Sequence, residues 1–287
     1  MTTKLKMPTL KFNLDDDFIR RTAKKVLFID IETSLIDARV FRAGLQQVNA
    51  AQATSKTRIL TVAGGTLYDL VGQGEGGVWS CSNHRSSTFK KDPLDDTEIL
   101  ATVWYELDKA EVVVAHNATF DKGWLFGRFL ELGWKLPSRF FLFCTYRNLQ
   151  NFNMVSKKLD ELSQTLIGTK KIATNMDLWM RCSEGEKEAF IEMEEYNIGD
   201  VFNTLFKVFM RTAYYNPSKS IDFSNPKNER ANCRVDGSVL EDYGTHRNRL
   251  NGLDYRLYKN KNAGIVYISR YNTKSKKADV GLVRHHT

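Results

Sequence analysis

The stretch KVLFIDIET, residues 25–33, decides the fold of this chain. The apolar run VLFI indicates a buried strand, and we predict that strand over residues 25–31. Asp30 and Glu32 stand two residues apart, so a strand places both carboxylates on the same face. Carboxylates at the end of a buried strand are costly unless something binds them. The stretch therefore predicts a central strand that presents two acidic groups to a ligand.

Two further motifs along the chain also present acidic side chains, one after an apolar run and one on a helix face. Asp121, in HNATFD, follows a second apolar run, VVVA, and lies near the start of a predicted helix. Tyr196 and Asp200, in YNIGD, are four residues apart in another predicted helix and therefore share one face. The acidic run around Tyr196 could also form a solvated helix face. Oxygen ligands in this number suit Mg²⁺ or Mn²⁺.

Metal-dependent phosphodiester chemistry is the use we predict for these groups. Two divalent ions can hold the attacking and leaving oxygens of such a cleavage. A phenol beside the ions can orient the attacking water, a role that we assign to Tyr196. We predict a nuclease with two Mg²⁺ or Mn²⁺ ions, whose metal ligands are Asp30, Glu32, Asp121 and Asp200.

The pattern of apolar residues between the motifs predicts a mixed α/β sheet. Helix 95–107 is expected to begin at an N-cap formed by Asp95 or Asp96, and helix 120–132 to end at Gly133. We expect residues 1–24 to form a polar arm packed over the first domain, residues 43–53 to tend towards helix, and residues 168–175 to form a basic loop. We predict strands over residues 25–31, 59–71, 76–82, 111–117 and 139–145, and helices over 95–107, 120–132, 156–166 and 184–209.

Charge divides the chain into two predicted parts, residues 1–215 and 216–287. The first holds 28 Lys/Arg and 27 Asp/Glu, a net charge of +1, and the second holds 14 and 7, a net charge of +7. Pro217 and Pro226 indicate a linker, and DYRLYKN and GIVYISRY beyond it predict a β-hairpin. The basic extension either attracts nucleic acid or solubilises the protein.

Other features exclude several classes of protein. The four cysteines form no CxxC pair, which favours scattered thiols over a disulfide framework or a zinc site. Gly72, Gly74 and Gly77 match GxGxxG, but a strand is predicted after them, so we expect a flexible hairpin loop and no dinucleotide site. No apolar run suits a membrane span and no signal peptide is evident. We expect a cytoplasmic protein that does not bind membranes.

The motifs together resemble the ribonuclease H-like 3′–5′ exonuclease superfamily, in the DEDD branch that carries a tyrosine (DEDDy). The first motif matches at Asp30 and Glu32, the second at Asp121, and the third at Tyr196 and Asp200. The resemblance covers residues 25–212; within it, 156–182 and 194–201 are similar to phage-encoded and bacterial predicted exonucleases. It implies a ribonuclease H-like five-stranded sheet with one antiparallel strand, two divalent ions, and removal of nucleotides from a 3′ end.

The C-terminal part, small and β-rich, resembles a degenerate zinc ribbon. Cys233 stands at the first ligand position, but Asp236 stands at the second and KNKN, residues 259–262, replaces the second cysteine pair. One cysteine cannot complete a four-ligand site, so no zinc is expected.

Four residues beside the acidic motifs are predicted to contact substrate. Thr33 follows the first motif. His116 either touches a phosphate or metal-bound water, or satisfies backbone groups at the strand end. Asn117 offers an amide to a sugar or phosphate, and Phe120 either offers its ring to a terminal base or packs in the core. Basic side chains that either follow the nucleic-acid backbone or form a solvated surface are Lys157, Lys158, Lys170 and Lys171.

The predicted partner is the 3′ end of DNA or RNA, and a replication or repair protein is a second candidate partner. If the chain is phage-encoded, its compartment is the bacterial host cell. Two other functions remain open at this point: a structure-selective endonuclease of the same fold, and a non-catalytic nucleic-acid-binding protein.

Overall fold

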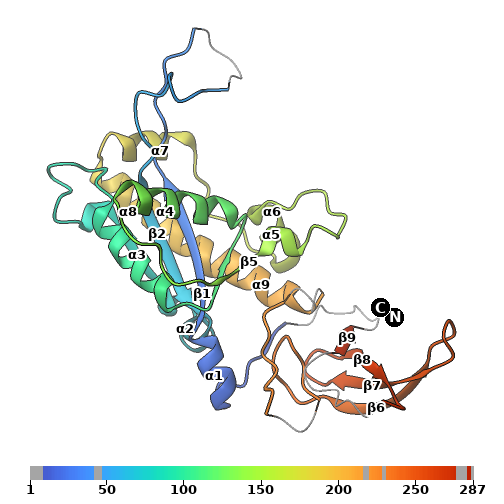
Figure 1. Ribbon diagram of the computed structural model, residues 1–287. Helices are drawn as coiled ribbons and strands as arrows, with labels where there is room; N and C mark the ends of the chain where they lie inside the picture. Colours follow the sequence, from blue (N-terminus) through green and yellow to red (C-terminus); the bar gives the residue numbers. More distant parts are fainter. Residues whose placement is uncertain (1–8, 42–46, 216–219, 228–230, 276–282, 286–287) are drawn as a thin grey trace.

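The computed structural model describes residues 9–41, 47–215, 220–227, 231–275 and 283–285 (Figure 1). Its centre is a five-stranded mixed sheet in the order β3-β2-β1-β4-β5. β2 runs antiparallel to β1 and β3, whereas β4 is parallel to β1 and β5. The predicted mixed sheet with one antiparallel strand is therefore confirmed. The strands are β1 (Val26–Thr33), β2 (Ile59–Thr66), β3 (Trp79–Ser82), β4 (Val112–Ala115) and β5 (Phe141–Cys144).

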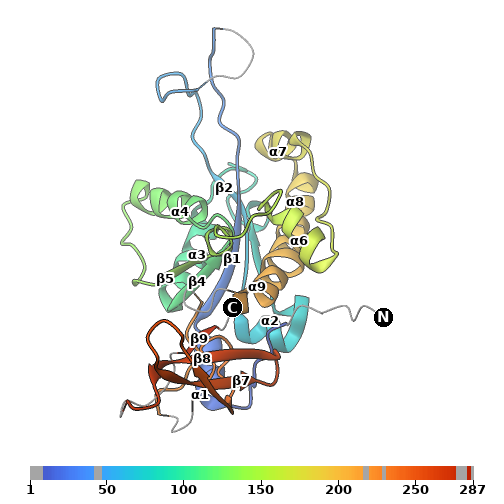
Figure 2. The ribbon, with the colours of Figure 1, turned by 90° about the vertical axis from the view of Figure 1, so that its right-hand side faces the viewer.

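Helices cover both faces of this sheet because β1 is apolar on both sides. Val26 and Phe28 belong to one buried cluster, and Leu27 and Ile29 belong to another. The first cluster packs against helix α6, a π-helical turn η3 and helix α9, and the second packs against α3 and α4 (Figure 2). The elements are α3 (Thr97–Lys109), α4 (Thr119–Glu131), α6 (Leu159–Ile167), α8 (Lys187–Gly199), η3 (Asp200–Phe206) and α9 (Lys207–Thr212).

The second strand is shorter than predicted. Residues 67–71 were expected to continue the strand, but β2 ends at Thr66 and helix α2 (Leu67–Gln73) begins there. The cause is local: the Thr66 hydroxyl caps the helix by accepting the Asp69 N–H at 3.2 Å. The glycine-rich stretch is likewise not a flexible loop. It ends α2 and forms a 3₁₀ turn, η1 (Gly74–Gly77), that leads into β3 rather than opening a helix.

The other predicted helices are present, but their first and last residues differ from the predicted ones. Asp96 occupies the N-cap position of α3, but its carboxylate accepts the Ile59 N–H and binds Arg128 instead of capping the helix. The Asp95 carboxylate, the other predicted cap, accepts the Thr97 N–H at the start of α3 at 3.1 Å. Residues 156–158 precede α6, and the helix predicted over 184–209 begins at Lys187. Short helices that were not predicted are α1 (Asp17–Ala23), α5 (Thr145–Asn148) and α7 (Met176–Ser183). Among the described residues, no helix is long and apolar enough to cross a membrane.

An extended arm connects β1 to β2, and we define it as the described residues 34–41 and 47–58. Residues 47–53 were expected to tend towards helix, but they contain turns and a single β-bridge, Ala38 to Ala53; the other part of that prediction, residues 43–46, lies outside the described residues. Both ribbon views show the arm projecting from one end of the central sheet, away from the C-terminal sheet (Figures 1 and 2).

A second, antiparallel sheet forms the C-terminal part. It has the order β6-β7-β8-β9, and its central pair confirms the predicted hairpin. The strands are β6 (Glu241–Arg247), β7 (Asp254–Asn260), β8 (Ile265–Asn272) and β9 (Val283–His285). The described part of the predicted linker is packed rather than free, because Ile221 and Phe223 are buried in the same cluster as Phe28. Pro217 lies outside the described residues.

The position expected to hold a degenerate zinc ribbon contains a buried hydrogen-bond network. Asp236 accepts from the Tyr214 hydroxyl at 2.6 Å and from the Asn260 side-chain amide at 3.1 Å. Cys233 lies beside the Tyr267 hydroxyl at 3.5 Å. Cys233 and the other three cysteines are free thiols, as predicted. The network joins the turn after α9 to the second sheet.

Candidate metal centre

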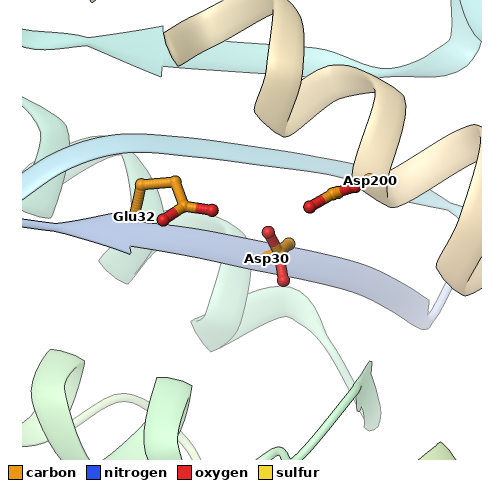
Figure 3. Close-up of side chains that lie close together, drawn as sticks. All are labelled: Asp30, Glu32 and Asp200. Atoms are coloured by element: carbon orange, nitrogen blue, oxygen red, sulfur yellow. The ribbon is translucent and has the colours of Figure 1, made fainter. Parts of the chain in front are cut away.

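Three of the predicted acidic residues come together at the end of β1. Asp30 and Glu32 lie on the same face of the strand, and Asp200 approaches them from the first residue of η3 (Figure 3). One carboxylate oxygen from each lies within 4.8 Å of the others. Glu32 and Asp200, which are 168 residues apart in the chain, thus supply ligand atoms to one group.

Asp121 reaches the same region from another element. It lies in the first turn of α4, beyond the end of β4, and is only 4% exposed. It is not a member of the three-residue group, but its charge raises the pKa of both Asp30 and Glu32. Burial raises the pKa of Asp121 itself to about 7, although its own backbone N–H and that of Ile31 favour the charged form.

The neighbouring carboxylates destabilise the negative charges of Asp30 and Glu32. Burial raises the pKa of Asp30 well above its ordinary value, and the neighbouring Asp200, Asp121 and Glu32 raise it further. Burial also raises the pKa of Glu32 to about 8, with Asp200 as the next cause. Desolvation and like charges both penalise ionised carboxylates. A cation bound among them would remove this penalty, so the chemistry of the donor set fits Mg²⁺ or Mn²⁺.

Lys171 is the cation that the chain itself places at this cluster. Its Nζ lies 2.5 Å from an Asp200 carboxylate oxygen and donates to the Tyr196 hydroxyl at 3.1 Å. Although burial alone would lower the pKa of Lys171, Asp200 and Tyr196 raise it above its ordinary value. The side chain is only 20% exposed, so Lys171 is not the solvated surface residue that was the favoured alternative.

Tyr196 therefore lies within the cluster, as its spacing from Asp200 predicted. Burial raises its pKa, with the charge of Asp200 as the next cause, so the phenol stays protonated. The helix changes from α to π geometry at Asp200, and the Thr204 hydroxyl donates to the Asp200 carbonyl oxygen at 2.5 Å. Such π-turns within helices are frequent at functional sites.

Two residues that were not predicted hold the first motif in place. The Asn197 side-chain amide donates to Asp30 at 2.7 Å, and Asn197 is completely buried. Trp179, from α7, hydrogen-bonds Glu32 and lowers its pKa. Asn197 follows Tyr196 directly in YNIGD, and a polar residue there was the available signal. No sequence pattern indicated that Trp179 would contact Glu32, because α7 itself was not predicted.

The four residues predicted to contact substrate lie near the acidic motifs, and they differ in burial and in their contacts. His116 contacts the Thr145 hydroxyl at 2.8 Å through Nδ1, and burial lowers its pKa to about 4. Asn117 is exposed and has a positive φ of 57°. Phe120 is 45% exposed, so it is not a core residue. Thr33 lies at the end of β1, where the pairing with β2 shifts register.

The other three basic candidates do not join the cluster. Lys158 and Lys170 are exposed. The Lys157 ammonium donates to the backbone carbonyl of Gln150 at 3.0 Å. Of the four, only Lys171 contacts the acidic cluster in the described part of the chain.

A scan against protein-family models and a search of curated proteins both find no match to this chain. Its function must therefore be inferred from the arrangement of its own side chains.

Proposed function

We propose that this protein is a metal-dependent 3′–5′ exonuclease with a ribonuclease H-like fold, which hydrolyses phosphodiester bonds of DNA or RNA. The observation that carries the proposal is the convergence of Asp30, Glu32 and Asp200 within 4.8 Å, with Asp121 and Tyr196 beside them. The strand order β3-β2-β1-β4-β5, with β2 antiparallel, supports the same assignment.

The four carboxylates would hold two Mg²⁺ or Mn²⁺ ions, which supply charge stabilisation at the phosphate and activate water for attack. The protonated Tyr196 hydroxyl would orient the attacking water by a hydrogen bond. The water oxygen bonds to phosphorus, the bond between phosphorus and the preceding 3′ oxygen breaks, and that oxygen takes up a proton. The products are a nucleoside 5′-monophosphate and a strand shortened by one nucleotide.

Lys171 has a defined part in this proposal. In the absence of divalent ions, its ammonium neutralises the buried Asp200 carboxylate. Divalent ions held by these carboxylates would compete with Lys171 for Asp200. Lys171 therefore keeps the acidic cluster folded before the ions enter.

The proposal is tested with 3′-labelled and 5′-labelled DNA and RNA strands, and with a circular strand, each incubated with Mg²⁺ or Mn²⁺ and resolved on a gel. We expect stepwise shortening from the 3′ end, no cleavage of the circle, and inhibition by EDTA. Asp200→Asn is expected to abolish cleavage, whereas Asp177→Asn, at an exposed carboxylate on α7, is expected to leave it unchanged. Cleavage of the circle would indicate an endonuclease, and intact strands throughout would contradict the proposal.

A further inference from the structure

The strand β5 forms one edge of the central sheet, and a cavity of about 460 Å³ lies along it (Figure 2). All four residues of β5, Phe141–Cys144, line this cavity. Successive side chains of a strand point to opposite faces of its sheet. Because residues of both faces border the same cavity, the cavity lies beside the edge of the strand rather than over one face of the sheet.

The backbone of β5 has an unused side that faces this cavity. The Phe141 N–H donates to the Glu111 carbonyl at 2.8 Å, on the side of β4. The N–H and C=O groups of successive strand residues alternate between the two sides of the strand, so those of Leu142 point away from β4. Among the described strands, β5 pairs with β4 alone. Leu142 therefore offers one donor and one acceptor to a further strand.

The sequence of β5 does little to prevent such pairing. Native edge strands commonly carry a charged residue or a proline, and FLFC contains neither. Phe141, at the start of the strand, is 59% exposed. The four residues span roughly 13 Å, at about 3.3 Å for each residue. The edge therefore suits an added segment of four or five residues.

The lining of the cavity beyond β5 is cationic. Arg147 borders it from α5, and Arg234 borders it from the C-terminal part. Arg147 is exposed and has no acidic partner among the described residues. Arg234 is held in place by the Ser220 carbonyl, which accepts from its Nη2 at 3.3 Å, and by Asp222 at 3.6 Å. The described lining contains no carboxylate, so the cavity is complementary to an acidic group.

We propose that the edge of β5 and this cavity bind an extended acidic peptide segment of a partner protein. The peptide adds a sixth strand to the five-stranded sheet, exchanges backbone hydrogen bonds with Leu142, and pairs one of its carboxylates with Arg147. A second copy of this chain suits the edge less well, because residues 138–150 contain no acidic residue that could meet Arg147. The proposal does not depend on the exonuclease activity.

The test begins with a library of random octapeptides displayed on filamentous phage and selected on the full chain in EDTA. We expect the enriched peptides to carry Asp or Glu. The most enriched peptide is then labelled with fluorescein and titrated by fluorescence anisotropy. Arg147→Glu should weaken its binding at least about tenfold, an effect of the order expected for a lost charge-assisted hydrogen bond. Arg249→Glu, the same charge change at an exposed arginine in the turn after β6, is the matched control and should bind as the wild type does.

Methylation of single backbone nitrogens of the peptide separates strand addition from charge attraction alone. Only alternate N–H groups of an added strand face β5, so we expect losses of about tenfold at alternate residues and small effects between them. Hydrogen–deuterium exchange, read by mass spectrometry, should slow in the fragment that contains β5 when the peptide is bound. Both measurements use the wild type and remain available should Arg147→Glu not fold by circular dichroism.

Several results would overturn the proposal. They are a library without enriched peptides, equal binding by folded Arg147→Glu and the wild type, and equal effects of methylation at every position. A dimer by light scattering that dissociates in Phe141→Lys would assign the edge to a second copy of the chain instead. If no peptide is enriched but a dT₈ strand loses affinity about tenfold in Arg147→Glu, the cavity binds nucleic acid and the proposal is wrong. Peptide binding with the expected pattern supports the proposal whether or not the protein cleaves nucleic acid.

Discussion

Glu32→Gln is expected to stabilise the metal-free protein at neutral pH, although it removes a residue of the proposed active site. Burial and Asp200 raise the pKa of Glu32 to about 8, from an ordinary value of 4.5. Between these two values the folded state binds more protons than the unfolded state, so the free energy of unfolding falls as pH rises. The penalty is absent below pH 4.5 and grows until pH 8.

The size of the effect follows from the same values. One pKa unit corresponds to about 1.36 kcal/mol, so the interval from 4.5 to pH 7 gives an upper limit of about 3.4 kcal/mol. Glu32 is partly exposed, and solvent screening reduces the expected gain to about 2 kcal/mol. For a chain of this size, that gain corresponds to an increase in Tm of roughly 4–8 °C.

The measurement is urea denaturation of both proteins from pH 5 to pH 9 in EDTA. Glu32→Gln should show a shallower fall in stability with pH, and Glu161→Gln, at an exposed carboxylate on α6, should match the wild type. Mn²⁺ at 100 times its Kd would stabilise the wild type by about 2.7 kcal/mol and the variant by less. The reasoning is refuted if Glu32→Gln is less stable than the wild type in EDTA with an unchanged slope.

Three further changes test other parts of the structure. Tyr196→Phe should lower single-turnover cleavage about 100-fold while oligonucleotide affinity is retained, since only the hydroxyl that orients water is lost; equal losses in both would argue for a binding role. Lys171→Met should destabilise the protein in EDTA by about 2–3 kcal/mol because it leaves Asp200 buried without its partner. Thermal denaturation should show that Mn²⁺ restores most of that loss, and an equal loss with and without Mn²⁺ would contradict competition for Asp200. Gly64→Ala should cost about 1–3 kcal/mol in urea denaturation, because its Cβ would lie 2.6 Å from the Trp79 ring and 2.9 Å from the Phe28 carbonyl oxygen. Gly76→Ala, where nothing lies within 4 Å, is its control, and equal stabilities of the two variants would contradict the packing argument.

The sequence predicted the central sheet and the acidic cluster because both depend on short-range patterns. Alternation along VLFIDIET places Asp30 and Glu32 on one face, and a four-residue spacing does the same for Tyr196 and Asp200. The end of β2 was missed although Thr66 and Asp69 carry a helix-capping signal, since the apolar run continues past them.

Other features of the site had no pattern from which to predict them. Lys171 is one of several lysines in a polar segment, and only the tertiary structure brings it to Asp200. Asp96, one of two residues expected to cap a helix, instead joins the start of β2 to Arg128 on α4. Such contacts between distant segments are set by packing, which spacing along the chain does not encode.

The continuous core between the two sheets limits how the C-terminal part can be studied. Phe223 and Val235 share one buried cluster with Phe209, and Asp236 accepts a hydrogen bond from Tyr214. Shortening the protein at residue 215 would uncover these apolar surfaces and leave the Tyr214 hydroxyl without its acceptor. Loss of activity after such a deletion would report misfolding rather than a missing nucleic-acid contact. Charge reversals at exposed residues of the second sheet and its turns, such as Arg247 on β6 and Lys261 after β7, are the informative substitutions there.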